Sequence, residues 1–174
     1  SNMNTANEVL VLDEAGAAGL PENFKTTYKT DDNRYEIPAI NATNDPVMKN
    51  AASEETRKAY YMKFYNRAAD KNLAVLESLV QKRYELAQLL GYKSYAAYNL
   101  EPKMAKNPET VWAFLNDLIA RTTEKATSDL AELNATKSAA LSDENAGDIQ
   151  GWDIAYYHNQ ILKTCTLKSV VHSI

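Results

Sequence analysis

Residues 72–94, NLAVLESLVQKRYELAQLLGYKS, carry the clearest structural pattern in the chain. Apolar side chains recur in this stretch at steps of three and four, a spacing that places them on one face of an α-helix. Gly91 follows the last apolar residue, as is typical of a helix C-terminus. The pattern predicts a helix over residues 72–90, with an apolar face formed by Leu73, Leu76, Val80, Tyr84, Ala87 and Leu90.

Two shorter helices are predicted on either side of this one. Ser53 is a good N-cap and is followed by two glutamates, whose negative charge complements the helix dipole. We expect this helix to cover residues 53–69. Ser94 begins another helix, which should end near Pro102 because proline disfavours helical geometry in the residue before it.

A long helix is predicted after Asn107, which acts as the cap, with Pro108 at the first helical position. Its apolar stripe runs from residue 108 to about 137. We expect the helices 72–90 and 108–137 to be antiparallel neighbours that bury these stripes against each other. Leu76 and Leu118 should then be core residues, and truncating either to alanine should cost roughly 2 to 5 kcal/mol.

The first fifty residues have a different character. The runs EVLVL (8–12) and YEIPAI (35–40) form either a small β-hairpin or two extended segments, and Gly19-Leu20-Pro21 marks a turn into a short helix. The predicted fold is all-α, an irregular bundle of about five helices. Residues 1–50 form an extended or mixed segment packed on a helical domain, residues 51–174.

Composition fits a soluble globular domain, since 45% of the 174 residues are hydrophobic and 24% are charged. The net charge of -4 gives no attraction to phosphate backbones or anionic lipid, so neither nucleic acid nor a membrane is an expected partner. No apolar run approaches the roughly 20 residues that span a bilayer. Ser1 and Asn2 before Met3 look like an expression scar, and no signal peptide is recognisable. The compartment stays open, with the cytoplasm favoured.

The sequence offers few residues for catalysis. A hydrolytic zinc site needs at least three ligands, commonly including two histidines one helical turn apart. The only histidines, His158 and His172, are far apart, no HExxH occurs, and no acidic residue follows Asp153. Cys165 is the single cysteine and lies in no nucleophile motif. We therefore expect no catalytic residue and no metal ligand in this chain.

Four helical motifs in succession point to a family. They lie in RKAYYMKFYNRAADKN (57–72), in RYELAQLLGYKSYAAYNLEPKMAKNPETVWAFLNDL (83–118) and in WDIAYYHNQI (152–161). In this order they resemble the thimet oligopeptidase, oligopeptidase A and dipeptidyl carboxypeptidase family of zinc metallopeptidases. The resemblance covers residues 20–163, and LPENF (20–24) and YEIPAI resemble the approach to the same helices.

The resemblance implies a largely helical, two-lobed enzyme that cuts short peptides in a deep channel. In that family the HExxH helix and a further zinc-binding glutamate lie downstream of the WD..YY helix, so no catalytic or zinc-binding position can be carried over. Zinc is expected only in full-length members, and this chain alone is predicted to be inactive. Of the matching positions, Trp152, Asp153 and Tyr157 are the binding candidates, although the family implies scaffold roles for them.

The ending, TCTLKSVVHSI (164–174), departs from the family, whose members continue with a lysine- and glutamate-rich helix. We expect a polypeptide truncated by nature, by a frameshift or by an artificial boundary.

Two functions from different classes stay open. The first is a non-catalytic fragment of an oligopeptide-cleaving zinc metallopeptidase. The second is a free-standing helical module that binds peptides or a protein through tyrosine-rich faces. In either case the apolar side of the helix that begins at Trp152 is expected to fold back on the long helix or to form a homodimer.

Overall fold

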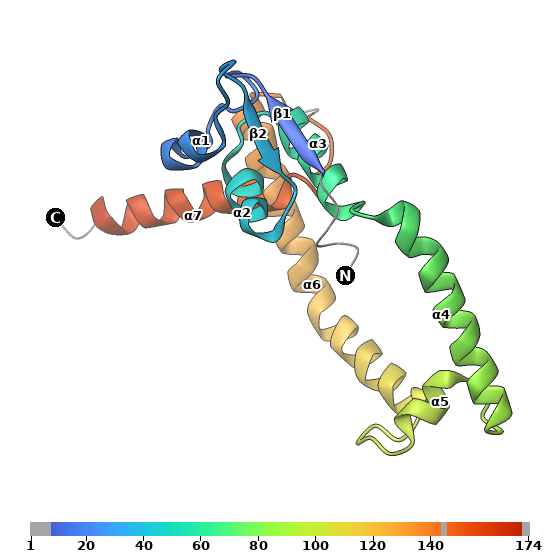
Figure 1. Ribbon diagram of the computed structural model, residues 1–174. Helices are drawn as coiled ribbons and strands as arrows, with labels where there is room; N and C mark the ends of the chain where they lie inside the picture. Colours follow the sequence, from blue (N-terminus) through green and yellow to red (C-terminus); the bar gives the residue numbers. More distant parts are fainter. Residues whose placement is uncertain (1–7, 144–145, 172–174) are drawn as a thin grey trace. The chain divides into compact units, whose positions relative to one another are not determined.

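The computed structural model describes residues 8–143 and 146–171. Within them it contains seven helices and one sheet of two strands, which confirms the expected all-α class with a small β element (Figure 1). Contacts divide the chain into two compact units. Unit 1 comprises residues 1–68 and 129–174, and unit 2 comprises residues 69–128.

Unit 1 combines the sheet with helices from both ends of the chain. Its two strands pair antiparallel, and they are separated in sequence by a helix rather than by a tight turn. Helix α6 begins in unit 2 and ends in unit 1. The elements of unit 1 are β1 (Val9–Leu12), α1 (Glu22–Tyr28), β2 (Tyr35–Pro38), α2 (Asn41–Asn50), α3 (Glu54–Tyr65), the end of α6 (Pro108–Leu141) and α7 (Ile154–Val171).

The core of unit 1 lies between the sheet, α2 and α3. Buried side chains from all three elements form one apolar cluster that includes Ile37, Val47 and Tyr60. The hydroxyl of Tyr60 lies 2.8 Å from that of Thr43 and donates to the carbonyl of Ile40 at 3.1 Å, so its polar tip is satisfied inside the core. These bonds fix α3 against the start of α2.

Helix α2 was not expected from the sequence, because Asn, Asp and Pro46 inside it are poor helix formers. Its packing explains it. Val47 and Met48 are buried in the core, and Thr43 is buried under the hydroxyl of Tyr60. Tertiary burial therefore outweighs local propensity in this segment.

Gly19 allows the N-terminal loop to approach the α2–α3 connection closely. Its φ is +83°, and a Cβ at this position would collide with the carbonyl oxygen of Asn50. The neighbouring Ala18 carbonyl accepts a hydrogen bond from the Ala52 amide at 2.9 Å. The turn expected at Gly19 is thus also a packing site.

Unit 2 contains α4 (Ala69–Leu89), α5 (Tyr95–Leu100) and the first part of α6. The predicted cap of α5 is confirmed, since Ser94 Oγ accepts from the Ala97 amide at 3.1 Å. Asn107 likewise caps α6, accepting from the Thr110 amide at 2.8 Å. Arg83 on α4 lies 5.1 Å from the ring centre of Tyr95, which joins α4 to α5.

One predicted boundary was wrong. The helix expected over residues 53–69 ends at Tyr65, and α4 starts at Ala69. Ser53 caps α3 as expected, accepting from the Thr56 amide at 3.2 Å. The break follows from Ala68, whose φ of +55° lies in the left-handed region and cannot continue a right-handed helix.

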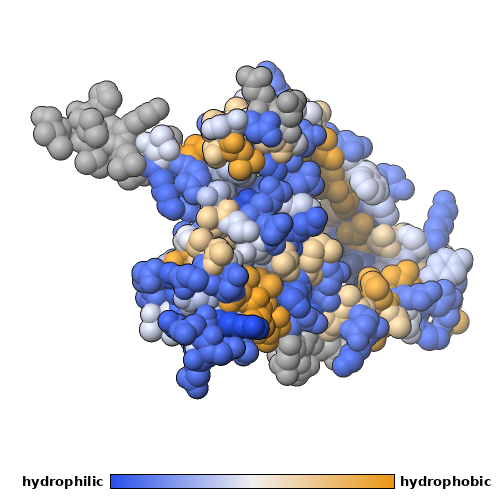
Figure 2. All heavy atoms as spheres, turned by 90° about the horizontal axis from the view of Figure 1, so that it is seen from above, coloured by the Kyte–Doolittle hydropathy of each residue, from blue (hydrophilic) through white to orange (hydrophobic). Residues whose placement is uncertain are grey.

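The expected packing of 72–90 against 108–137 was also wrong. Helix α4 contacts α5, but it has no extended contact with α6 in the described part of the chain. Leu76 is 54% exposed and Leu118 is 46% exposed. Hydrophobic side chains accordingly lie at the surface among polar ones (Figure 2). Helical spacing shows which face of a helix is apolar, but it does not identify what covers that face.

Truncation experiments separate the two kinds of position. Leu76→Ala and Leu118→Ala should each lower the free energy of unfolding by less than about 1 kcal/mol, because both side chains are already half in water. Ile37→Ala, at a fully buried core position, should cost roughly 2 to 5 kcal/mol. Urea unfolding followed by circular dichroism measures all three variants. Equal losses for Leu76→Ala and Ile37→Ala would contradict the exposed placement of α4.

Among the described residues, no helix is both long enough and apolar enough to cross a membrane.

Candidate functional site

The three candidate binding residues, Trp152, Asp153 and Tyr157, come together at the start of α7. Asp153 is fully buried, and its carboxylate accepts hydrogen bonds on both oxygens. Arg57 of α3 donates to Oδ1 at 2.8 Å, and Lys137 of α6 donates to Oδ2 at 2.8 Å. One carboxylate therefore joins three helices of unit 1.

Arg57 is held on several sides. Its Nη1 donates to the carbonyl oxygens of Ala51 and Ala52 at 2.9 and 3.0 Å, which ties α3 to the end of α2. Its guanidinium lies 4.1 Å from the ring centre of Tyr156 and 5.7 Å from that of Tyr157. Its Nε is buried without a hydrogen-bond partner among the described residues.

Glu54 supplies a second negative charge. Its Oε2 lies 3.5 Å from Lys137 Nζ, and its Oε1 accepts from the indole of Trp152 at 3.2 Å. Lys58 Nζ lies 5.1 Å from the centre of the Trp152 ring system. We call Glu54, Arg57, Lys137 and Asp153 the Asp153 cluster; it holds two cations and two anions.

The surroundings favour the charged forms of Asp153 and Lys137. Burial raises the pKa of the Asp153 carboxyl, but the hydrogen bonds from Arg57 and Lys137 outweigh it, so the pKa lies below its ordinary value. Burial lowers the pKa of Lys137, and its contacts with Asp153 and Glu54 reverse this, so the pKa is raised. Burial also raises the pKa of the Tyr157 phenol.

The Asp153 cluster is built to hold helices together rather than to transfer protons. A general acid or base must be able to reach the proton that it transfers. Asp153 is buried with both oxygens occupied by cations, and Lys137 is buried between two carboxylates. The cluster therefore fixes the start of α7 against α3 and α6.

The described residues do not form a metal site of the kind that a zinc peptidase needs. No group of three His, Cys, Asp or Glu side chains within residues 8–143 and 146–164 is arranged to hold a metal ion. His158 is exposed on α7. The side chain of Cys165 and all of His172 lie outside the described residues.

Sequence reasoning proposed Trp152, Asp153 and Tyr157 as binding candidates and did not name Arg57, Lys137 or Glu54 as their partners. Glu54 was interpreted only as a first-turn acid of α3, and Lys137 was not singled out at all. Arg57 offered a signal, since it stands in a matching motif on a tyrosine-rich helix. A lone arginine among aromatic side chains is a candidate for a buried, stacked position.

Comparison with known proteins identifies the family. The model of peptidase family M3 matches residues 47–170, a segment that contains the whole Asp153 cluster. The chain belongs to peptidase family M3. This confirms the resemblance seen in the four helical motifs.

Individual relatives agree with this family assignment. Oligopeptidase A of Escherichia coli strain K12 is 36% identical over 161 residues, which cover 85% of this chain and 23% of the relative. Saccharolysin of Saccharomyces cerevisiae is 33% identical over 171 residues, covering 92% and 24%. Mitochondrial intermediate peptidase of Yarrowia lipolytica is 32% identical over 162 residues, covering 93% and 20%. The M3 chain thus spans about a quarter of the length of these relatives.

Removing the central charge tests the cluster. Asp153→Asn keeps the shape of the side chain but leaves Arg57 and Lys137 buried with one partner charge fewer. We expect a loss of roughly 3 to 5 kcal/mol in the free energy of unfolding, because an uncompensated buried charge is costly. Asp45→Asn is the matched control, since it breaks an exposed pair with Lys49 and should cost less than about 1 kcal/mol. Urea unfolding of both variants provides the comparison.

The pH dependence gives an independent measure of the same cluster. Folding lowers the pKa of Asp153, so its contribution is present above the unfolded value of about 3.9 and is lost as the pH falls through the folded value. Folding raises the pKa of Lys137, so its contribution is present below about 10.4 and is lost as the pH rises through the folded value. The difference in the free energy of unfolding between the parent chain and Asp153→Asn should therefore narrow below about pH 3.9 and above about pH 10.4. A gap that stays constant down to pH 2 would contradict the paired carboxylate.

Proposed function

We propose that this chain is a non-catalytic helical part of an oligopeptide-cleaving zinc metallopeptidase and that it lacks the zinc site. The observation that carries the proposal is the family match over residues 47–170, taken together with a sequence that contains no HExxH. The relatives carry names of peptidases, and this chain corresponds to 20–24% of their lengths.

The contribution of this part is structural. The Asp153 cluster holds the start of α7 against α3 and α6 through buried ion pairs. In the proposed enzyme the catalytic region lies downstream of α7, so the cluster fixes the position of α7 relative to the helices that precede it. A buried, fully paired carboxylate suits this role because moving any one helix would leave a charge unpaired.

Zinc loading and turnover test the proposal. The purified chain is dialysed with zinc, its bound metal is measured, and it is then incubated with a quenched fluorescent peptide. We expect no stoichiometric zinc and no cleavage above the rate of the buffer blank. Oligopeptidase A of Escherichia coli is the positive control. Stoichiometric zinc, or cleavage that a chelator abolishes, would refute the claim that this chain lacks the catalytic apparatus.

A second candidate is a free-standing module that binds peptides or a protein without cleaving them. Exposed apolar and aromatic side chains of unit 2 favour it, among them Trp112 and Phe114 near the start of α6. Surfaces of this kind commonly mark interaction sites. Peptide binding without turnover, by a chain with no zinc, is the result that supports it.

We also propose a homodimer formed through α7. Ile154 and Leu162 on this helix are each about half exposed, whereas Tyr157 is buried. Apolar side chains on one helix face are suited to a two-fold contact in which the patch meets its own copy. Within the chain, α7 packs mainly against α2. This packing against α2 takes the place of the expected folding back on the long helix α6.

Light scattering at micromolar concentration tests the dimer. We expect a dimeric mass for the parent chain and a monomeric mass for Leu162→Lys, which places a charge in the contact. Lys163→Leu serves as the control for a general effect of substitution in this helix. A parent chain that stays monomeric would exclude this interface.

A further inference from the structure

The outer edge of β1 is open. The Ala39 amide donates to the Glu8 carbonyl at 2.7 Å, next to the pair formed by Val9 and Pro38. In an antiparallel ladder, opposed residues alternate between hydrogen-bonded and non-hydrogen-bonded pairs. Even-numbered residues of β1 therefore bond to β2, and the backbone N–H and C=O groups of Val9 and Val11 point away from it.

The opposite edge of the sheet is closed. Tyr35 of β2 forms a bridge with Lys29, and the Thr30 amide donates to the Arg34 carbonyl at 2.8 Å. Pro38, further along β2, has no N–H to offer. Of the two edges, β1 is thus the one with free hydrogen-bonding groups in the described part of the chain.

The edge of β1 is short, but its side chains offer none of the usual protection. Exposed edge strands in natural proteins commonly carry lysine, proline or a bulge, which discourage pairing with another chain. Residues 9–12 are Val-Leu-Val-Leu and carry none of these features. The side chains of Val9 and Val11 are 37% and 48% exposed. An apolar edge without lysine, proline or a bulge favours a strand partner.

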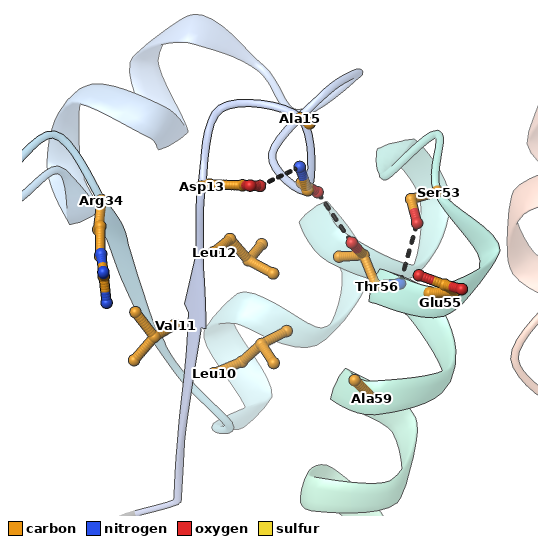
Figure 3. A pocket seen from close by; sticks show the side chains of 11 residues that line it. Leu10, Val11, Leu12, Asp13, Ala15, Arg34, Ser53, Glu55, Thr56 and Ala59 are labelled. Carbon is orange, nitrogen blue, oxygen red and sulfur yellow. Dashed lines mark hydrogen bonds between the residues drawn. The ribbon is translucent and has the colours of Figure 1, made fainter.

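A groove of about 820 Å³ runs beside this edge. Its walls are β1, the loop 13–16 and the start of α3, with Arg34 at one side (Figure 3). Figure 3 shows Leu10 and Leu12 pointing from β1 toward α3, and Val11 pointing the other way. Thr56 Oγ1 donates to the Gly16 carbonyl at 2.9 Å, which fixes the loop to α3. The groove is therefore bounded by held segments and is open along the strand.

The backbone groups of β1 and the charges beside them indicate what kind of molecule would bind in the groove. Only an extended chain presents donors and acceptors at the two-residue spacing that Val9 and Val11 require. Apolar side chains on it would lie beside the exposed valines. Asp13 and Glu55 bring two exposed carboxylates to the groove, whereas its one cation, Arg34, already lies 3.6 Å from Asp32.

We propose that an extended peptide with apolar and basic residues binds along β1 as a third strand. The peptide class rests on the function proposed above, and the binding site rests on the geometry of the strand. The peptide backbone pairs with Val9 and Val11, and its basic side chains face Asp13 and Glu55.

Binding is measured by fluorescence anisotropy with the full chain and a labelled hexapeptide. The peptide has alternating valine and threonine residues between terminal lysines. Val11→Pro removes the outward N–H and should weaken binding about tenfold. Val11→Thr keeps that N–H and is the matched control, with binding unchanged within about twofold. Circular dichroism of both variants verifies that they fold.

A second measurement leaves the protein untouched. Two peptides carry N-methyl groups, one on both valines and the other on both threonines. In an added strand, alternate residues face β1, so one peptide should lose binding and the other should keep it. Equal loss, or no loss, in the two peptides would overturn the proposal.

Two further outcomes would also overturn it. One is the absence of binding up to about 1 mM peptide, which corresponds to negligible affinity. The other is a chain dimer that Val11→Pro makes monomeric while the peptide has no effect, because the occupant would then be a second copy. Cleavage of the peptide would refute the proposed function and leave the binding site intact, so the two failures are distinguishable.

Discussion

The carboxylate of Asp153 accepts hydrogen bonds from Arg57 on α3 and from Lys137 on α6 while it stands at the start of α7. Removing three charged groups from water is costly, and their mutual attraction offsets that cost only with close geometry. Glu54 completes the balance by contacting both Lys137 and the indole of Trp152. The arrangement of these helices depends on this balance because apolar packing alone would tolerate several crossing angles.

Local features of the fold were predictable from the sequence. Ser53, Ser94 and Asn107 each cap a helix as expected, because a cap involves residues only three positions apart. Leu76 and Leu118 were assigned to the core by the same local pattern, and this was wrong because burial depends on which surface arrives from elsewhere. Helical periodicity carries no information about that surface.

The candidate site shows the same division. Trp152, Asp153 and Tyr157 were proposed as binding candidates from one short motif, and they lie close together because they are near neighbours in sequence. Arg57 is 96 positions from Asp153 in sequence, and no local pattern connects the two. The pairing emerges only once the chain has folded. The strands are a similar case. Short β-branched and aromatic runs left a hairpin or two extended segments open, and they did not indicate which edge of a sheet would stay unpaired.

Unit 1 is discontinuous in sequence, since the residues of unit 2 lie between its two parts. This has a consequence for synthesis on the ribosome. At a rate of about 5–20 residues per second, the 96 positions between Arg57 and Asp153 take roughly 5 to 20 s to produce. During that time α3 is complete and carries its arginine without the carboxylate that neutralises it. The buried core residues of the sheet, α2 and α3 are all made by then, so the step that has to wait is the pairing of Arg57 with Asp153, which attaches α7.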